Sequence, residues 1–181
     1  MEKAMRENNI PLYSLETFTP LNEFDFVGFT LQYEMCYTNI LNMLDMSGIP
    51  VYAKDRGEDD PIIVCGGSCA YNPEPLVDFV DFFYLGEGEV EYDHIMEIYK
   101  EHKKNGGKRE EFLRKLLSVN GMYVPRFYDV TYKENGEIAS FEPNVPEAPR
   151  TIRKVIVTDM DSVYYPPKMI VPLIETVHDR V

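Results

Sequence analysis

Pro61-Ile62-Ile63-Val64-Cys65-Gly66-Gly67 is the stretch that decides the fold, because it is an apolar run closed by two glycines. Such a run, about four to eight residues long, is too short for a helix and is typical of a strand covered on both faces. Similar runs occur at residues 26–32 (FVGFTLQ) and 81–85 (DFFYL), and Gly-Glu-Gly-Glu follows the second at 86–89. The sequence therefore predicts three buried strands.

Helical periodicity follows two of these strands. Residues 37–44 carry apolar side chains at the spacing i, i+3, i+4 and i+7, which forms one face of a helix. A similar pattern covers residues 92–99, and glycines at 48 and 106–107 predict where the two helices end. Strands that alternate with helices predict an α/β domain with a mostly parallel sheet, of the Rossmann or flavodoxin-like kind.

The flanking segments have other patterns. Residues 1–9 predict a polar helix, and the alternation in residues 12–17 predicts a short edge strand. Residues 109–119 predict a further helix, and residues 152–157 one more strand. Two alternating segments around Asn135-Gly136 predict a β-hairpin, because Asn-Gly is favoured in two-residue hairpin turns.

These patterns divide the chain into three parts. We expect a partial Rossmann domain over residues 1–105 and a helix and β-hairpin extension over residues 106–160. Residues 161–181 contain three prolines, which predict a linker.

Composition excludes several classes of function. The chain has 181 residues, of which 44% are hydrophobic and 27% charged, an ordinary globular mixture. Its net charge of −13 disfavours nucleic acid and anionic membrane as partners. The one basic cluster, residues 103–109, is interpreted as a solvated helix end and turn.

We see no signal peptide and no apolar run of about 18 residues that could span a membrane. Three cysteines do not suggest a disulfide framework, so we expect a cytoplasmic protein.

Small residues follow all three predicted strands, and ligands of open parallel sheets bind beyond the carboxyl ends of the strands. Glycine lets the backbone approach a ligand closely, and free N–H groups can bind a phosphate or an amide. The predicted cofactor-binding residues are Thr30, Gly66, Gly67, Ser68, Gly86, Glu87 and Gly88. The alternative is that the glycines only turn tight corners. Glu87 and Glu89 are interpreted as a helix cap and a hydrogen-bonding group rather than as an acid/base pair.

Other candidate sites are weaker. Cys65 and Cys69 have the spacing of half a cluster-binding motif, but Asn72 stands where a third cysteine is needed. His94 and His102 have no further cysteine or histidine partner and are interpreted as surface residues. We therefore predict no catalytic residue and no metal site in this chain, and no G-x-G-x-x-G run indicates a nicotinamide cofactor.

Taken together, the segments Val27-Gly28-Phe29-Thr30, Gly66-Gly67 with Pro73-Glu74, and Asp81 to Glu89 resemble the B12-binding-type N-terminal region of radical SAM proteins. The family pattern is V-G-x-S, then G-G-x-x-x-x-x-P-E, then D-x-x-x-x-G-E-G-E. Thr30 stands where the family usually has serine. The tail, including Val177-His178-Asp179-Arg180, is similar to the approach to the radical SAM barrel in an uncharacterised iron–sulfur oxidoreductase-like subgroup.

The resemblance implies a cobalamin-binding-like module that has no catalytic activity alone. The parent enzyme would bind S-adenosylmethionine and a [4Fe–4S] cluster through a C-x-x-x-C-x-x-C motif that this chain lacks. Cobalamin is the candidate cofactor of the module itself, and the radical SAM barrel of the same parent chain is its expected partner. The sequence indicates neither the substrate nor the reaction nor the oligomeric state.

We also expect the chain to be truncated at both ends. The family's first strand, with the loop that carries a cobalt-ligating histidine, would precede residue 1, and the cluster cysteines would follow residue 181. Unpaired strand edges then predict poor stability or self-association. Two alternatives remain: a degenerate cap that binds no corrinoid and serves structure or substrate recognition, and a free-standing flavodoxin-like binding domain.

Overall fold

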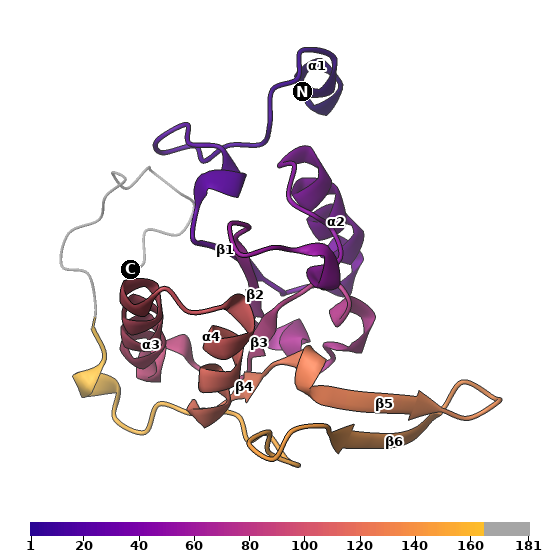
Figure 1. Ribbon diagram of the computed structural model, residues 1–181, viewed down its shortest axis with the longest axis vertical. Helices are drawn as coiled ribbons and strands as arrows, with labels where there is room; N and C mark the ends of the chain where they lie inside the picture. Colours follow the sequence, from indigo (N-terminus) through magenta and orange to yellow (C-terminus); the bar gives the residue numbers. More distant parts are fainter. Residues whose placement is uncertain (165–181) are drawn as a thin grey trace, which may run out of the picture.

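The computed structural model describes residues 1–164, so most of the predicted linker, and His178 with it, lies outside the described residues (Figure 1). Short helical turns connect the longer elements. In chain order, these elements are α1 (Glu2–Glu7), β1 (Phe26–Thr30), α2 (Tyr37–Met46), β2 (Ile62–Gly66), β3 (Phe82–Tyr84), α3 (Tyr92–Asn105), α4 (Arg109–Lys115), β4 (Met122–Tyr123), β5 (Tyr128–Tyr132) and β6 (Ile138–Pro143).

The central sheet has the strand order β1-β2-β3-β4. β1, β2 and β3 are parallel, whereas β4 pairs with β3 in the antiparallel direction. The register places Thr30 opposite Gly66, so the carboxyl ends of the parallel strands meet at one edge of the sheet. The predicted α/β class with a mostly parallel sheet is confirmed. Within residues 1–164, no strand of the sheet pairs with the outer edge of β1.

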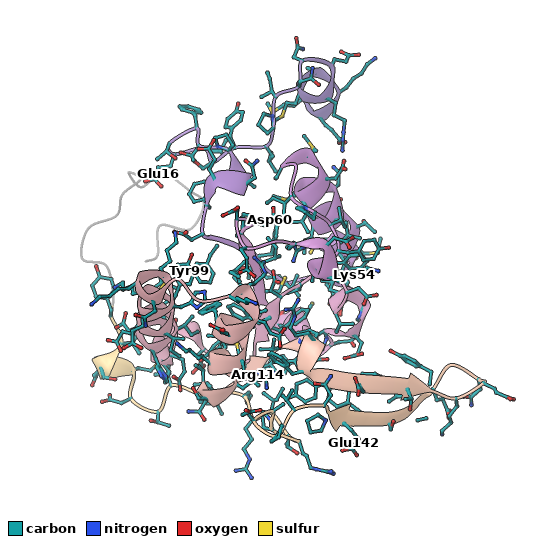
Figure 2. All side chains as sticks on the ribbon, viewed as in Figure 1. Glu16, Lys54, Asp60, Tyr99, Arg114 and Glu142 are labelled. Atoms are coloured by element: carbon teal, nitrogen blue, oxygen red, sulfur yellow. The ribbon has the colours of Figure 1, made fainter. Side chains whose placement is uncertain are left out.

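Helices lie on both sides of this sheet (Figure 1). The ring of Phe26 on β1 packs against Tyr99 of α3, with centroids 4.5 Å apart, and against Phe112 of α4, 6.0 Å away (Figure 2 labels Tyr99). Ile40 and Leu44 of α2 are buried in the core on the other side. Two covered faces explain why the strands are continuous apolar runs rather than alternating ones.

The hairpin of β5 and β6 is the second, separate sheet, as predicted around the Asn-Gly turn. Gly136 has φ +84°, whereas Asn135 has no positive φ, so the loop differs from the predicted two-residue Asn-Gly turn. Gly136 N donates to Lys133 O (3.0 Å) and Lys133 N donates to Glu137 O (2.8 Å), which is the three-residue loop that ends in a left-handed glycine. None of the helices within residues 1–164 is long and apolar enough to cross a membrane.

Two predicted strands are wrong. Residues 12–17 do not join the sheet, because the segment folds back on itself: Ser14 N donates to Thr19 O (2.9 Å), and Tyr13 and Pro20 form only an isolated bridge. Residues 152–157 contribute a single parallel bridge from Val155 to Gly86 and no regular strand. Conversely, β4 is a two-residue strand that no pattern in the sequence predicted.

A buried ion network joins Asp81, next to β3, to two arginines from distant parts of the chain. The Asp81 carboxylate accepts hydrogen bonds from Arg56 Nη1 (2.9 Å), Arg109 Nη2 (2.8 Å) and the Ile63 backbone N–H (2.8 Å). The Asp81 and Arg56 side chains are 0% exposed, and that of Arg109 is 5% exposed. The interpretation of residues 103–109 as a solvated helix end is therefore wrong for Arg109, because its charge is satisfied internally.

Candidate functional site

The sheet brings two groups of predicted site residues together at the carboxyl ends of β1 and β2. Thr30 is the register partner of Gly66, and Gly67 and Ser68 form the turn that follows. Thr30 and Ser68 are exposed at this edge. A Cβ atom at Gly66 would lie 3.7 Å from Tyr84 O at the end of β3, an ordinary contact. This edge therefore presents two hydroxyl groups beside a strand end that tolerates a small side chain.

Gly67 is required by the chain itself. It has φ +96°, and a Cβ atom there would lie 2.8 Å from Leu31 O and 3.0 Å from Leu31 N. The same backbone is fixed by two hydrogen bonds, from Leu31 N to Gly66 O (2.6 Å) and from Cys69 N to Leu31 O (2.8 Å). The tight-corner alternative thus explains Gly67 without a ligand.

Gly86 is also covered by the chain's own backbone. It has φ +125°, and a Cβ atom would collide with the backbone of Val155. Val155 N donates to Leu85 O (3.0 Å), and Glu87 N donates to Val155 O (3.1 Å). The Glu87 carboxylate accepts a hydrogen bond from the Val157 N–H. Glu87 therefore anchors the segment around Val155 across the end of β3.

The N-terminus of α3 is not capped by Glu87 or Glu89, the two residues considered from the sequence. The residue at the N-cap of α3 is Glu91, and it makes no side-chain capping bond. Its carboxylate instead accepts from Asn120 Nδ2 (2.9 Å) and lies 3.2 Å from His94 Nδ1. Glu89 is exposed on the turn before the helix. His94 is half-exposed, in keeping with its interpretation as a surface residue.

An apolar cavity of about 360 Å³ lies between the sheet and α3. Gly28 and Gly88 leave it open: a Cβ atom at Gly28 would approach nothing closer than Val64 Cγ1 (3.5 Å), and one at Gly88 would find nothing within 4 Å. Burial raises the pKa of Tyr84 to about 12, and its hydroxyl donates to Glu87 O (3.0 Å). The lining of the cavity is mainly apolar, so it suits an apolar group better than acid/base chemistry. Residues that line it include Phe26, Gly28, Val64, Tyr84, Gly88 and Ile95.

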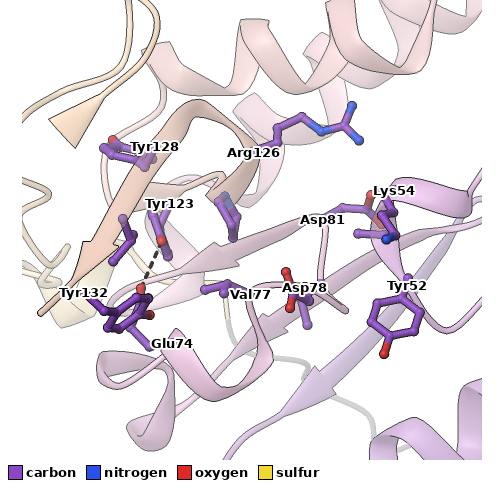
Figure 3. Close-up of a pocket in the computed structure, with 14 residues that line it drawn as sticks. Tyr52, Lys54, Glu74, Val77, Asp78, Asp81, Tyr123, Arg126, Tyr128 and Tyr132 are labelled. Atoms are coloured by element: carbon purple, nitrogen blue, oxygen red, sulfur yellow. Dashed lines mark hydrogen bonds between the residues drawn. The ribbon is translucent and has the colours of Figure 1, made fainter. Parts of the chain in front are cut away.

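A second cleft, of about 510 Å³, lies between β5 and the loops that follow α2 and β2 (Figure 3). Glu74 lies in it and accepts a hydrogen bond from Tyr123 OH (3.1 Å). Sequence reasoning did not select Glu74 as a site residue, although Pro73-Glu74 belongs to the motif that carries the family resemblance. The functional groups that line the cleft are Tyr52, Lys54, Glu74, Asp78, Tyr123 and Arg126.

The cysteines have no visible metal-binding geometry. Cys65 is buried in β2, and burial raises the pKa of its thiol to about 12, which disfavours the thiolate that metals bind. Among residues 1–164, no three His, Cys, Asp or Glu side chains lie close enough together to hold a metal ion.

Comparison with known proteins adds two findings. Residues 1–125, which include β1 to β4, match the family described as radical SAM proteins, N-terminal. An uncharacterized protein of Methanocaldococcus jannaschii is 27% identical over 175 residues, a match that covers 90% of this chain and 36% of that protein. The chain therefore spans about a third of the length of this relative. No solved structure matches the chain.

Proposed function

We propose, from the premise that this chain belongs to the family of radical SAM N-terminal domains, that it is an accessory module that binds the nucleotide tail of a cobalamin. The observation that carries this proposal is the apolar cavity between the sheet and α3, which two glycines keep open. Cofactor pockets are typically concave and mostly apolar, with a few polar groups at the mouth. The benzimidazole ring of a cobalamin tail is planar and largely apolar, so it suits the residues present.

The proposed roles of the residues follow from their positions. Gly28 and Gly88 would admit the ring, and Val64 and Ile95 would contact its faces. The exposed Thr30, two residues beyond Gly28 on β1, would hydrogen-bond the polar part of the tail through its hydroxyl group. Cobalamin would supply the reactivity of its cobalt, while the module would bind and orient it.

We propose further that the module works beside the radical SAM barrel of the same parent protein. By family, that barrel would bind S-adenosylmethionine and a [4Fe–4S] cluster. Because this chain spans about a third of its relative, the parent's substrate and reaction are left open.

Equilibrium dialysis of this chain against hydroxocobalamin tests the proposal. We expect retained corrinoid, and we expect cobinamide, which lacks the nucleotide tail, to bind at least about tenfold more weakly. Free dimethylbenzimidazole should compete with cobalamin. If neither corrinoid is retained, or if both bind equally, the proposed use of the cavity is wrong.

The variant Gly28→Leu sharpens this test, because the new side chain would fill the cavity from an extended strand that tolerates it. We expect corrinoid affinity to fall at least about tenfold with the far-ultraviolet circular dichroism unchanged. Ala139→Leu, a similar enlargement at an exposed position of β6, is the matched control and should bind as the original chain does.

A second function, a cap that binds no corrinoid, is favoured by one observation. Gly67 and Gly86, two of the glycines predicted to approach a cofactor, instead approach the backbone of Leu31 and Val155. On this proposal the module contributes shape and substrate contacts to the parent. Failure of the original chain to retain either corrinoid would favour it.

A further inference from the structure

The Tyr123–Glu74 cleft is separate from the cavity assigned to the cofactor. It lies at the amino end of β3, next to Asp81, which precedes the strand, and residues of β5 also line it (Figure 3). The two cavities have no lining residue in common. What binds in this cleft is therefore a question that the cofactor experiment does not answer.

Glu74 is the unusual residue in the cleft. Its Oε1 accepts a hydrogen bond from Tyr123 OH (3.1 Å), while its Oε2 is buried and has no hydrogen-bond partner among residues 1–164. Leaving a buried acceptor unpaired is unfavourable, and more so when the group is charged. Buried polar groups without a partner are rare in folded proteins, and each calls for a specific explanation. A donor brought by a ligand is one such explanation.

Tyr123 cannot take over that role. Burial and the neighbouring Glu74 carboxylate raise the pKa of Tyr123 well above its ordinary value, so the phenol stays protonated and its single proton points to Oε1. The phenol therefore orients the carboxylate and leaves Oε2 as a fixed acceptor. Because Tyr123 has no second donor to offer, the N–H or O–H group of a ligand can pair with this carboxylate.

The surroundings of Glu74 favour a positive charge. Figure 3 shows the rings of Tyr123 and Tyr132 beside Glu74, and the Asp78 carboxylate between Glu74 and Lys54. Aromatic rings attract cations through their negative faces, and two carboxylates add to that attraction. The chain as a whole has a net charge of −13, which attracts cations over longer distances.

The two cations of the cleft are not placed to neutralise Glu74. Lys54 Nζ lies 5.3 Å from the centroid of the Tyr52 ring and sits at the opposite end of the cleft (Figure 3). The guanidinium group of Arg126 is directed away from Glu74 in the same view. An anionic ligand would therefore have to sit away from Glu74, at the end near Lys54.

We propose that this cleft binds an aliphatic cation, an ammonium or guanidinium group that donates to the Glu74 carboxylate and lies against the tyrosine rings. Two sources carry this chemistry: a free amine or guanidine, and the lysine or arginine side chain of a peptide substrate. The site would give the module a substrate-binding role that does not depend on whether it also binds a cofactor.

Chemical-shift mapping on the nitrogen-15-labelled chain tests this proposal. The probes are n-butylammonium, n-butylguanidinium and, as a neutral control of similar shape, n-butanol. We expect the two cations to shift the backbone amides of Glu74 and Tyr123 in a saturable way, and n-butanol to bind at least about tenfold more weakly. Equal binding of n-butanol, or saturable binding of inorganic phosphate that shifts these amides instead, would overturn the proposal.

Glu74→Gln keeps the shape of the side chain and removes its charge. We expect cation affinity to fall at least about tenfold, with no loss of stability in urea, because the variant removes an unpaired buried charge. Glu137→Gln, the same change at the exposed turn of the hairpin, should bind cations normally. If Glu74→Gln destabilises the fold and leaves cation affinity unchanged, the carboxylate is structural and the proposal is wrong.

The peptides Gly-Lys-Gly and Gly-Arg-Gly distinguish the two sources, with Gly-Gln-Gly as the neutral control. Tighter binding of the cationic peptides than of the matching butyl compounds would assign the cleft to a peptide side chain. Equal or weaker binding would assign it to a free amine or guanidine. Failure of all of these cations to bind would refute the site, even if cobalamin bound elsewhere.

Discussion

Asp81→Asn is the substitution whose effect on the free energy of unfolding can be worked out most directly from the structure. Asp81 is fully buried and its carboxylate binds two arginines that are themselves buried, Arg56 and Arg109. Its oxygens accept three guanidinium hydrogen bonds, of 2.8, 2.9 and 3.3 Å, and one from the Ile63 N–H of 2.8 Å. Asparagine nearly preserves the volume but leaves two buried positive charges without a counter-ion.

Removing one partner from a buried ion pair typically costs about 3–5 kcal/mol. We expect the lower end of that range, because both guanidinium groups keep hydrogen bonds to backbone carbonyls. Arg56 donates to Pro50 O (3.0 Å) and Phe79 O (2.6 Å), and Arg109 donates to Pro61 O (2.7 Å). For a domain of this size, about 3 kcal/mol lowers Tm by roughly 6–12 °C. A typical domain stability of about 5–15 kcal/mol leaves the variant mostly folded.

Urea denaturation followed by far-ultraviolet circular dichroism measures this cost, with an unchanged m-value as evidence that the same surface unfolds. Glu110→Gln is the control, because Glu110 forms an exposed i,i+4 pair with Arg114, worth at most about 0.5 kcal/mol. High salt should reduce the small stability loss of Glu110→Gln more than that of Asp81→Asn, because salt screens exposed charges better than buried ones. If Asp81→Asn costs less than about 0.5 kcal/mol, the network does not hold the fold together and the reasoning fails.

Three further predictions follow from single residues. Gly67→Ala should destabilise the fold by about 1–3 kcal/mol in urea, because of its positive φ and close backbone neighbour, whereas Gly88→Ala should stay within about 0.5 kcal/mol; equal effects would contradict the assigned roles. Cys65 should resist a thiol reagent at about pH 8 until the chain unfolds, because burial keeps it protonated, and rapid labelling of the folded chain would show otherwise. Glu87→Ala should speed hydrogen exchange at the Val157 amide, and unchanged exchange would mean that the carboxylate does not anchor that segment.

The parts of the fold that the sequence predicted are those set by local pattern. β2 and α3 follow from a short apolar run and from helical spacing, and Gly106 ends α3 in a left-handed conformation, φ +64°. β4 was missed because two residues carry no periodicity and pair with β3 only after the chain returns to it. Residues 12–17 show the opposite failure: alternation indicates the form of a strand but cannot supply a neighbouring strand to pair with.

The candidate site shows a similar limit. A glycine-rich strand end indicates that something approaches the backbone closely, and at Gly67 and Gly86 this is true. The sequence cannot say whether the approaching group is a ligand or a distant part of the chain. At Gly86 it is Val155, far along the chain. Gly28, where a Cβ atom would make only an ordinary contact, and Gly88, where it would meet nothing within 4 Å, line the cavity.

The same limit applies to two acidic residues of the family motif, Asp81 and Glu74, because the sequence does not show whether the partner of each carboxylate is a ligand or another part of the chain. Asp81 is buried, whereas Glu74 is only partly buried and has one covered oxygen, and the sequence gives no reason to separate them. Their difference lies in two arginines: Arg56, and Arg109 from the segment interpreted as solvated, turn inward and satisfy Asp81, and neither is hydrogen-bonded to Glu74. A carboxylate that is paired with arginines of the same chain contributes to stability. A carboxylate with an oxygen that has no hydrogen-bond partner can still bind a cationic ligand. Both residues line the same cleft, so one cation-binding assay and one urea titration test them together. A stability loss for Asp81→Asn and a loss of cation binding without a stability change for Glu74→Gln would separate the two roles.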